Sequence, residues 1–324
     1  MRVLCILLLF GVVFTSSLIM TLPKFFCLKN DIPALRFDVH ESVVRSSMCP
    51  TEHVHVFDET LLIVMFNHKK HIKRNFALLK RMYGVRFPNM KYCSDTFIEE
   101  SAIHAPLYNG GETSRLSNPL GSLSYQCTLV AMERFPRQFS GYLSIADDVL
   151  LNMTRISELP LTEMWLESVD QRFSTRDMHA EGGRFALWSR LEPGGAKSSL
   201  SVEQDPQLDA RFRNKLVDLG WFNAAADIYY FPESTRAIFL HLAPIFLRAR
   251  VYFSNAVPTM MQLIQGESTV RKHVLRGISK WFYDKKRIQW QEYLPNLRNV
   301  DYYHPLKLSH LGDHISEMCA FVNG

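Results

Sequence analysis

The sequence has no C-x-x-C pair, no internal repeat and no strong excess of charge. Without cysteines at metal-binding spacing, a structural zinc site has no support. The net charge of +5 is modest, and 47% of the 324 residues are hydrophobic. Such a composition excludes a disordered chain and is enough to bury a core, either as one large domain or as a domain with a small appendage.

The first segment is apolar and uncharged from Val3 to Leu22, with Arg2 before it and Lys24 after it. About twenty such residues cross a bilayer as a helix, so we expect residues 1–22 to form a transmembrane signal anchor. A signal peptide cleaved near Thr15–Ser17 is the alternative, although the apolar run continues past that point. Either way we expect the chain to enter the secretory pathway. An anchored chain would be a single-pass type II protein of the Golgi or endoplasmic reticulum membrane with a lumenal domain, and a cleaved chain would be secreted.

The polar features are compatible with that compartment. Basic runs such as Lys69–Arg74 and Lys285–Arg287 are typical of solvated helix faces, and in a secretory compartment we expect no nucleic-acid partner. Asn152-Met153-Thr154 is the only N-glycosylation sequon, and the sequence leaves its use open. Five cysteines beyond the anchor allow two disulfides and one free thiol, namely Cys27, Cys49, Cys93, Cys127 and Cys319.

An α/β pattern begins at residue 60. Residues 60–66 form a continuous apolar run that ends at Asn67, as a buried parallel strand does. Residues 71–83 carry apolar side chains at helical spacing, and residues 89–95 predict a second strand that ends at Asp95. Strand, helix and strand in this order predict parallel pairing.

Two adjacent acids follow a later apolar run. Residues 140–146 predict a buried strand, and Asp147 and Asp148 come where it ends, at an exposed margin of the sheet. Mg²⁺ and Mn²⁺ are typically held by one or two carboxylates together with phosphate oxygens, and ligands of open α/β sheets gather beyond the carboxyl ends of strands. The sequence therefore predicts a metal-diphosphate site here. The alternative is that the two acids cap a following helix.

The second half of the chain has weaker patterns. Residues 192–207 are rich in Gly, Ser and Pro and predict a loop. Residues 221–232 predict a single strand with Asp227 in its middle, and residues 268–283 predict a helix.

Two stretches taken together resemble nucleotide-sugar glycosyltransferases of the GT-A type. SGYLSIADDVLL, residues 140–151, resembles the D-x-D metal-binding edge of that family, although its acids are adjacent instead of being separated by one residue. YYHPLKLS, residues 302–309, is similar to the His-x-x-Lys element near the C-terminus of several members. The resemblance covers residues 60–310 in outline. It implies an α/β fold with a GT-A-like, mostly parallel sheet flanked by helices.

The resemblance also implies roles for particular residues. A divalent cation, Mn²⁺ or Mg²⁺, would neutralise the departing diphosphate, and a carboxylate base would deprotonate the acceptor hydroxyl if the reaction inverts the anomeric centre. For every candidate except Lys307 the alternative is an ordinary structural role. The candidates are Asp147, Asp148 and His304 as metal ligands, Lys307 on the phosphates, Asn67 and Asp95 on the nucleotide, and Asp227 as the base.

We therefore expect a signal anchor at residues 1–22, a stem at residues 23–59 and a GT-A-like domain at residues 60–324. The expected function is metal-dependent transfer of a sugar from a nucleotide-sugar donor, for preference a UDP-sugar, to a glycan or glycoprotein acceptor. An anchored or secreted glycan-binding protein without turnover is the main alternative. A third is a different metal-dependent phosphoryl or nucleotidyl enzyme, because a fold does not fix its chemistry.

Overall fold

The computed structural model describes residues 56–66, 72–94, 103–104, 124–169, 171–173, 195–279, 299–306, 318–319 and 321–322, all within one compact unit. The predicted anchor lies outside these ranges, as does the predicted stem except for its last four positions. Within the described ranges, no helix has both the length and the apolar content that a bilayer crossing requires.

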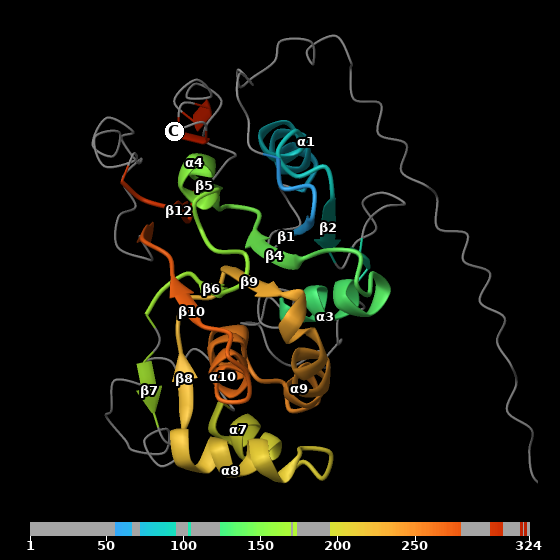
Figure 1. The fold of residues 1–324 in the computed structure, drawn as a ribbon, viewed down its shortest axis with the longest axis vertical. Coiled ribbons are helices and arrows are strands. Elements are labelled where there is room, and N and C mark those ends of the chain that lie inside the picture. Colours follow the sequence, from blue (N-terminus) through green and yellow to red (C-terminus); the bar gives the residue numbers. More distant parts are fainter. Residues whose placement is uncertain are drawn as a thin grey trace, which may run out of the picture. The chain divides into compact units, whose positions relative to one another are not determined.

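A seven-stranded sheet forms the centre of this unit, in the order β3-β2-β1-β4-β9-β6-β10 (Figure 1). In this sheet β9 runs antiparallel to β4 and β6, and the other four pairings are parallel, so the prediction of a mostly parallel sheet flanked by helices is confirmed. The strands are β1 (Thr60–Met65), β2 (Met90–Ser94), β3 (Ile103–His104), β4 (Gly141–Ala146), β6 (Met164–Leu166), β9 (Ile228–Pro232) and β10 (Lys272–Val274).

Helices cover both faces of the sheet because its central strands are apolar on both sides. Along β1, Leu61, Ile63 and Met65 belong to one core and Leu62 and Val64 to the other. Each such buried aliphatic side chain contributes about 1.5–3 kcal/mol of transfer free energy. The first core also contains side chains of α3 (Tyr125–Arg134), α9 (Arg236–Arg248) and α10 (Phe253–Gln265), and the second contains side chains of α1 (Ile72–Tyr83), which Figure 1 shows on the opposite side.

Smaller elements surround this frame. A three-stranded sheet has the order β11-β12-β5, and β7 pairs with β8. A disulfide between Cys93 and Cys127 joins β2 to α3, and Cys319 is also disulfide-bonded. The bounds are β5 (Leu150–Leu151), β7 (Gln171–Phe173), β8 (Trp221–Asn223), β11 (Gly277–Ser279), β12 (Tyr302–His304), α4 (Met153–Ile156), α7 (Gly195–Glu203), α8 (Ala210–Leu219) and a 3₁₀ turn at Glu233–Thr235.

Three local predictions were wrong. The predicted loop at residues 192–207 contains α7, whose Val202 is buried in the core. The predicted strand at residues 221–232 is two strands, β8 and β9, in different sheets, with Asp227 directly before β9. The predicted helix at residues 268–283 contains β10 and β11, which form because β6 and β12 supply partners from distant parts of the chain.

The strand order contains a topological switch point between β1 and β4. The chain leaves β1 for β2 on one side and later returns to β4 on the other side. Ligands of open α/β sheets bind at such a switch point, outside the carboxyl ends of the strands. Asp147 is the first residue after β4, and it therefore lies at this switch point.

Candidate metal centre

Three acids meet at one edge of the central sheet because of how β9 runs. Asp147 follows β4 and Glu167 follows β6, whereas Asp227 precedes β9. Since β9 is antiparallel to both neighbours, its first residue lies at the edge where β4 and β6 end. Backbone hydrogen bonds fix this alignment. The amide of Ala146 donates to the Asp227 carbonyl oxygen at 2.8 Å, and the amide of Glu167 donates to the Ile228 carbonyl oxygen at 3.0 Å.

The small sheet adds His304 to the same edge. Strand β12 pairs antiparallel with β5, with Tyr303 opposite Leu150, which sets the next residue of β12 beside the Asp148 segment. The amide of Leu306 donates to the carbonyl oxygen of Asp148 at 2.6 Å. The side chains also meet, with His304 Nε2 3.2 Å from Asp148 Oδ1.

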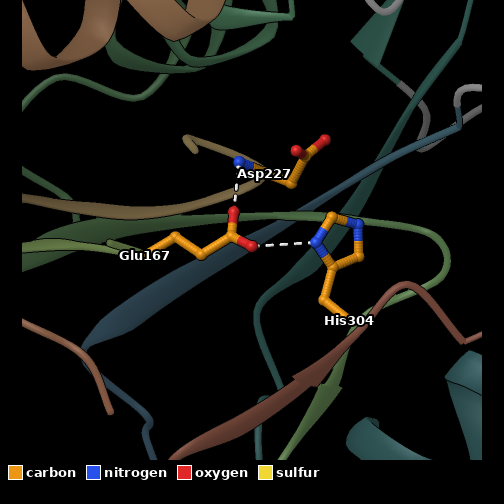
Figure 2. Close-up of side chains that lie close together, drawn as sticks. All are labelled: Glu167, Asp227 and His304. Carbon is orange, nitrogen blue, oxygen red and sulfur yellow. Dashed lines mark hydrogen bonds and ion pairs between the residues drawn. The ribbon is translucent and has the colours of Figure 1, made fainter. Parts of the chain in front are cut away.

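Glu167, Asp227 and His304 form a buried group that could hold a metal ion (Figure 2). One ligand atom from each residue lies within 4.8 Å of those of the other two. Figure 2 shows the Glu167 carboxylate between the other two residues. His304 Nδ1 is 2.8 Å from Glu167 Oε1, and the backbone amide of Asp227 donates to Glu167 Oε2 at 2.8 Å.

The two adjacent acids have different surroundings. The Asp148 side chain is 19% exposed and forms the ion pair with His304. Asp147 is buried, and the side-chain amide of Asn75 on α1 donates to its Oδ2 at 2.9 Å. The expectation that both acids lie at an exposed margin is therefore wrong for Asp147, because the chain turns directly after β4 and places that side chain against α1.

The crowding of negative charge shifts the proton equilibria of the site. Burial raises the pKa of the Asp227 carboxyl well above its usual range, and three neighbouring carboxylates raise it further while His304 opposes them. Burial disfavours the imidazolium of His304, but its interactions with Asp148 and Glu167 outweigh burial and raise its pKa well above the usual value. Three carboxylates, those of Asp148, Glu167 and Asp227, act on the imidazole of His304, and protons or a cation are needed to balance their charge.

The structure brings four of the predicted residues together. Asp148, Asp227 and His304 line one site, and Asp147 lies beside it, buried against α1. The three remaining candidates, which are Asn67, Asp95 and Lys307, lie outside the described residues.

Sequence reasoning missed Glu167 and Asn75. The signal for Glu167 was present, because it follows the apolar segment Met164–Leu166 as directly as Asp147 follows its strand. That segment is three residues long, too short for its period to distinguish a strand from a loop. Asn75 had no signal, since a single amide in a helix is ordinary until its partner Asp147 is known.

Comparison of the sequence with protein-family models and with curated proteins finds no match.

Proposed function

We propose that the protein is a metal-dependent glycosyltransferase of the GT-A type, which transfers a sugar from a nucleotide-sugar donor to a glycan or glycoprotein acceptor. The observation that carries the proposal is the convergence of Asp148, Asp227 and His304 at the carboxyl edge of a mostly parallel sheet. These residues come from three distant segments. A nucleotide diphosphate with its cation is the ligand class that such an edge accommodates.

The donor atoms at the site fit a divalent cation. Carboxylate oxygens suit Mg²⁺ and Mn²⁺, and an imidazole nitrogen suits first-row transition ions. His304 Nε2 and Asp148 Oδ1 are 3.2 Å apart. Two neighbouring ligand atoms on one octahedral ion, each about 2.1 Å from it, are roughly 3 Å apart, so this spacing is compatible with a shared ion. When bound, the ion would act as a Lewis acid that neutralises the charge developing on the departing diphosphate.

Asp227 is the proposed base for the acceptor hydroxyl. Burial and the neighbouring carboxylates raise its pKa, and a raised pKa makes a carboxylate a stronger base. Its backbone is hydrogen-bonded on both sides, to Ala146 through the carbonyl oxygen and to Glu167 through the amide, so the side chain starts from a fixed position. Lys307 remains the proposed phosphate contact, and Asn67 and Asp95 the proposed nucleotide contacts.

The proposed setting is the lumen of the Golgi or endoplasmic reticulum, with residues 1–22 as the membrane anchor. The disulfide between Cys93 and Cys127 and the bonded state of Cys319 support an oxidising compartment. The order β3-β2-β1-β4 supports nucleotide binding, since the same order surrounds the binding crevice of other doubly wound sheets.

The test is hydrolysis or transfer from a panel of sugar nucleotides by the purified full-length chain, with and without Mn²⁺. We expect Mn²⁺-dependent release of the nucleoside diphosphate from at least one donor, and at least a ~100-fold loss in Asp148→Asn, because that change removes a charged ligand. Asp218→Asn is the matched control, since Asp218 is an exposed residue of α8, a helix that carries none of the site residues. Donor turnover that needs no metal and survives Asp148→Asn would contradict the proposal.

The position of Asp147 favours one second candidate, a glycan-binding protein without turnover. The hydrogen bond from Asn75 and its burial keep this carboxylate away from solvent. Only Asp148 of the adjacent pair is partly exposed, whereas a D-x-D edge would offer two acids to the metal and the donor. That candidate predicts that the protein binds immobilised glycans but releases no diphosphate from any donor in the panel.

A further inference from the structure

Glu167 is completely buried, and both its backbone amide and its backbone carbonyl are hydrogen-bonded. Its backbone amide donates to the Ile228 carbonyl oxygen at 3.0 Å, and its own carbonyl oxygen accepts a hydrogen bond from the Tyr302 hydroxyl at 2.8 Å. Strands β9 and β12 therefore hold this residue from two sides. A carboxylate in such a place has little freedom to move toward a ligand.

Both carboxylate oxygens of Glu167 already have protein donors. Oε1 is 2.8 Å from His304 Nδ1, and Oε2 accepts the backbone amide of Asp227 at 2.8 Å (Figure 2). Because a carboxylate only accepts hydrogen bonds, the short contact with Oε1 requires a proton on Nδ1. The two bonds tie Glu167 to the side chain of one site residue and to the backbone of another.

The hydrogen bond to Nδ1 determines which side of the imidazole ring faces the site. The two ring nitrogens point in different directions, and Nε2 lies 3.2 Å from Asp148 Oδ1. Metal-bound histidines commonly donate their second N–H to a carboxylate, which fixes the tautomer and the ring orientation.

We propose that Glu167 is a positioning residue, which keeps the proton on Nδ1 of His304 and presents Nε2, beside Asp148, as the metal ligand. Glu167 itself does not coordinate the ion. This inference rests on the proposed metal-dependent function and specifies how the buried group works. The ion then lies on the Asp148 side of the imidazole ring, not on the Glu167 side.

The first test uses the unmodified full-length chain with ¹⁵N-labelled histidine. Zn²⁺ serves as a diamagnetic probe, and the His304 signals are identified by their loss in His304→Gln. With Zn²⁺ bound, we expect Nδ1 of His304 to retain its proton and Nε2 to show the shift of a metal-bound nitrogen. Metal on Nδ1, with the proton on Nε2, would overturn the inference.

The second test uses Glu167→Gln, which keeps the shape of the side chain. Its amide NH₂ group must face either His304 Nδ1 or the backbone amide of Asp227, so one of the two hydrogen bonds is lost. We expect the affinity for Mn²⁺, measured by electron paramagnetic resonance, to fall about 10–100-fold. The number of water molecules on bound Mn²⁺, measured from broadening by H₂¹⁷O, should stay the same. In Asp148→Ala it should rise by one, because a ligand is lost.

Glu163→Gln is the matched control. Glu163 directly precedes β6, the strand that Glu167 follows, and its carboxylate pairs with Arg271 at 2.7 Å, at the other end of the strand from the site. This control should bind Mn²⁺ like the wild type. An additional water on Mn²⁺ in Glu167→Gln, or an unchanged affinity, would overturn the inference while leaving the metal site in place. Failure of the wild type to bind any Mn²⁺ would overturn the proposed function and this inference together. If Glu167→Gln does not fold, the nitrogen spectrum of the wild type decides.

Discussion

His304 is the residue at which the two halves of the site meet. Its Nδ1 contacts Glu167, which follows a strand of the central sheet, and its Nε2 contacts Asp148, which follows another. The ring is buried, and its carboxylate neighbours raise its pKa despite that burial. The neighbouring carboxylates therefore favour the charged form of the imidazole, which balances part of their negative charge.

Mn²⁺ affinity should increase as the pH rises. The pKa values of His304 and Asp227 are both raised above their usual values of 6.5 and 3.8. Without the ion, each group therefore keeps its proton to a higher pH than usual. Binding at Nε2 must displace the proton there, which costs more free energy at low pH. We expect calorimetry between about pH 6 and 8 to show proton release and a falling Kd. A Kd independent of pH, with no proton released, would contradict this prediction.

Asn152 is a helix cap, and we predict that it carries no glycan. The residue is buried, and its side chain accepts a hydrogen bond from the Arg155 amide at the start of α4. Treatment of the protein from a secretory host with an N-glycosidase should leave its mass unchanged, and a shift in mass would contradict this.

The cap also predicts a stability effect. Asn152→Ala should lower the free energy of unfolding by about 1 kcal/mol, the usual cost of losing such a cap. Thr154→Ala removes the sequon but keeps the cap, so it should unfold like the wild type; Thr154 is exposed. Equal losses in both variants would show that the cap is not the cause.

At the scale of elements, long apolar runs were predictable and short strands were not. The pattern of residues 60–66 and 140–146 gave the strands and the place of the acid pair, because each run is buried on both faces. Strands β6 and β10 have three residues each and form by pairing with partners far along the chain. An apolar run of three residues is too short to be recognised as a strand, so the run before Glu167 did not place this residue at the site.

Strand β11 supports the site through Tyr302. Gly277 lies opposite this residue in the register of β11 and β12, and a Cβ at position 277 would overlap the Tyr302 ring. The Tyr302 hydroxyl in turn donates to the backbone of Glu167. The absence of a side chain at Gly277 is therefore a requirement of this contact.

Gly277→Ala should destabilise the protein and weaken Mn²⁺ binding together. Overpacking of this kind costs about 1–3 kcal/mol, which chemical denaturation would measure. Gly266→Ala is the control, because a Cβ there meets the flexible end of Lys215, which can move aside. Equal effects of the two substitutions, or an unchanged Mn²⁺ affinity in Gly277→Ala, would contradict the proposed link through Tyr302.

At the scale of the whole molecule, a covalent bond joins a strand of the central sheet to a helix whose side chains share its core. The disulfide between Cys93 and Cys127 connects β2 with α3 across a sequence separation of 34. Removing it in the Cys93→Ala/Cys127→Ala double variant should lower the free energy of unfolding by about 3 kcal/mol. The disulfide of Cys319 is still present in that variant, so the comparison isolates the effect of the Cys93–Cys127 bond. A double variant as stable in urea as the wild type would contradict this prediction.

No single segment carries the site. Asp148, Glu167, Asp227 and His304 lie at the ends of four different strands or turns, and two sheets must form before they meet. Any metal site here is thus a property of the folded chain, and binding of an ion to it would stabilise the fold by mass action.

The most direct test of the central claim is calorimetry of UDP binding to the full-length chain, with and without Mn²⁺, in the wild type and in Asp148→Asn. We expect UDP to bind the wild type at least ~10-fold more tightly with Mn²⁺, because the ion would link the diphosphate to the carboxylates, and we expect Asp148→Asn to abolish this gain. Equal UDP affinity with and without Mn²⁺ in the wild type, or an unchanged gain in the variant, would contradict it.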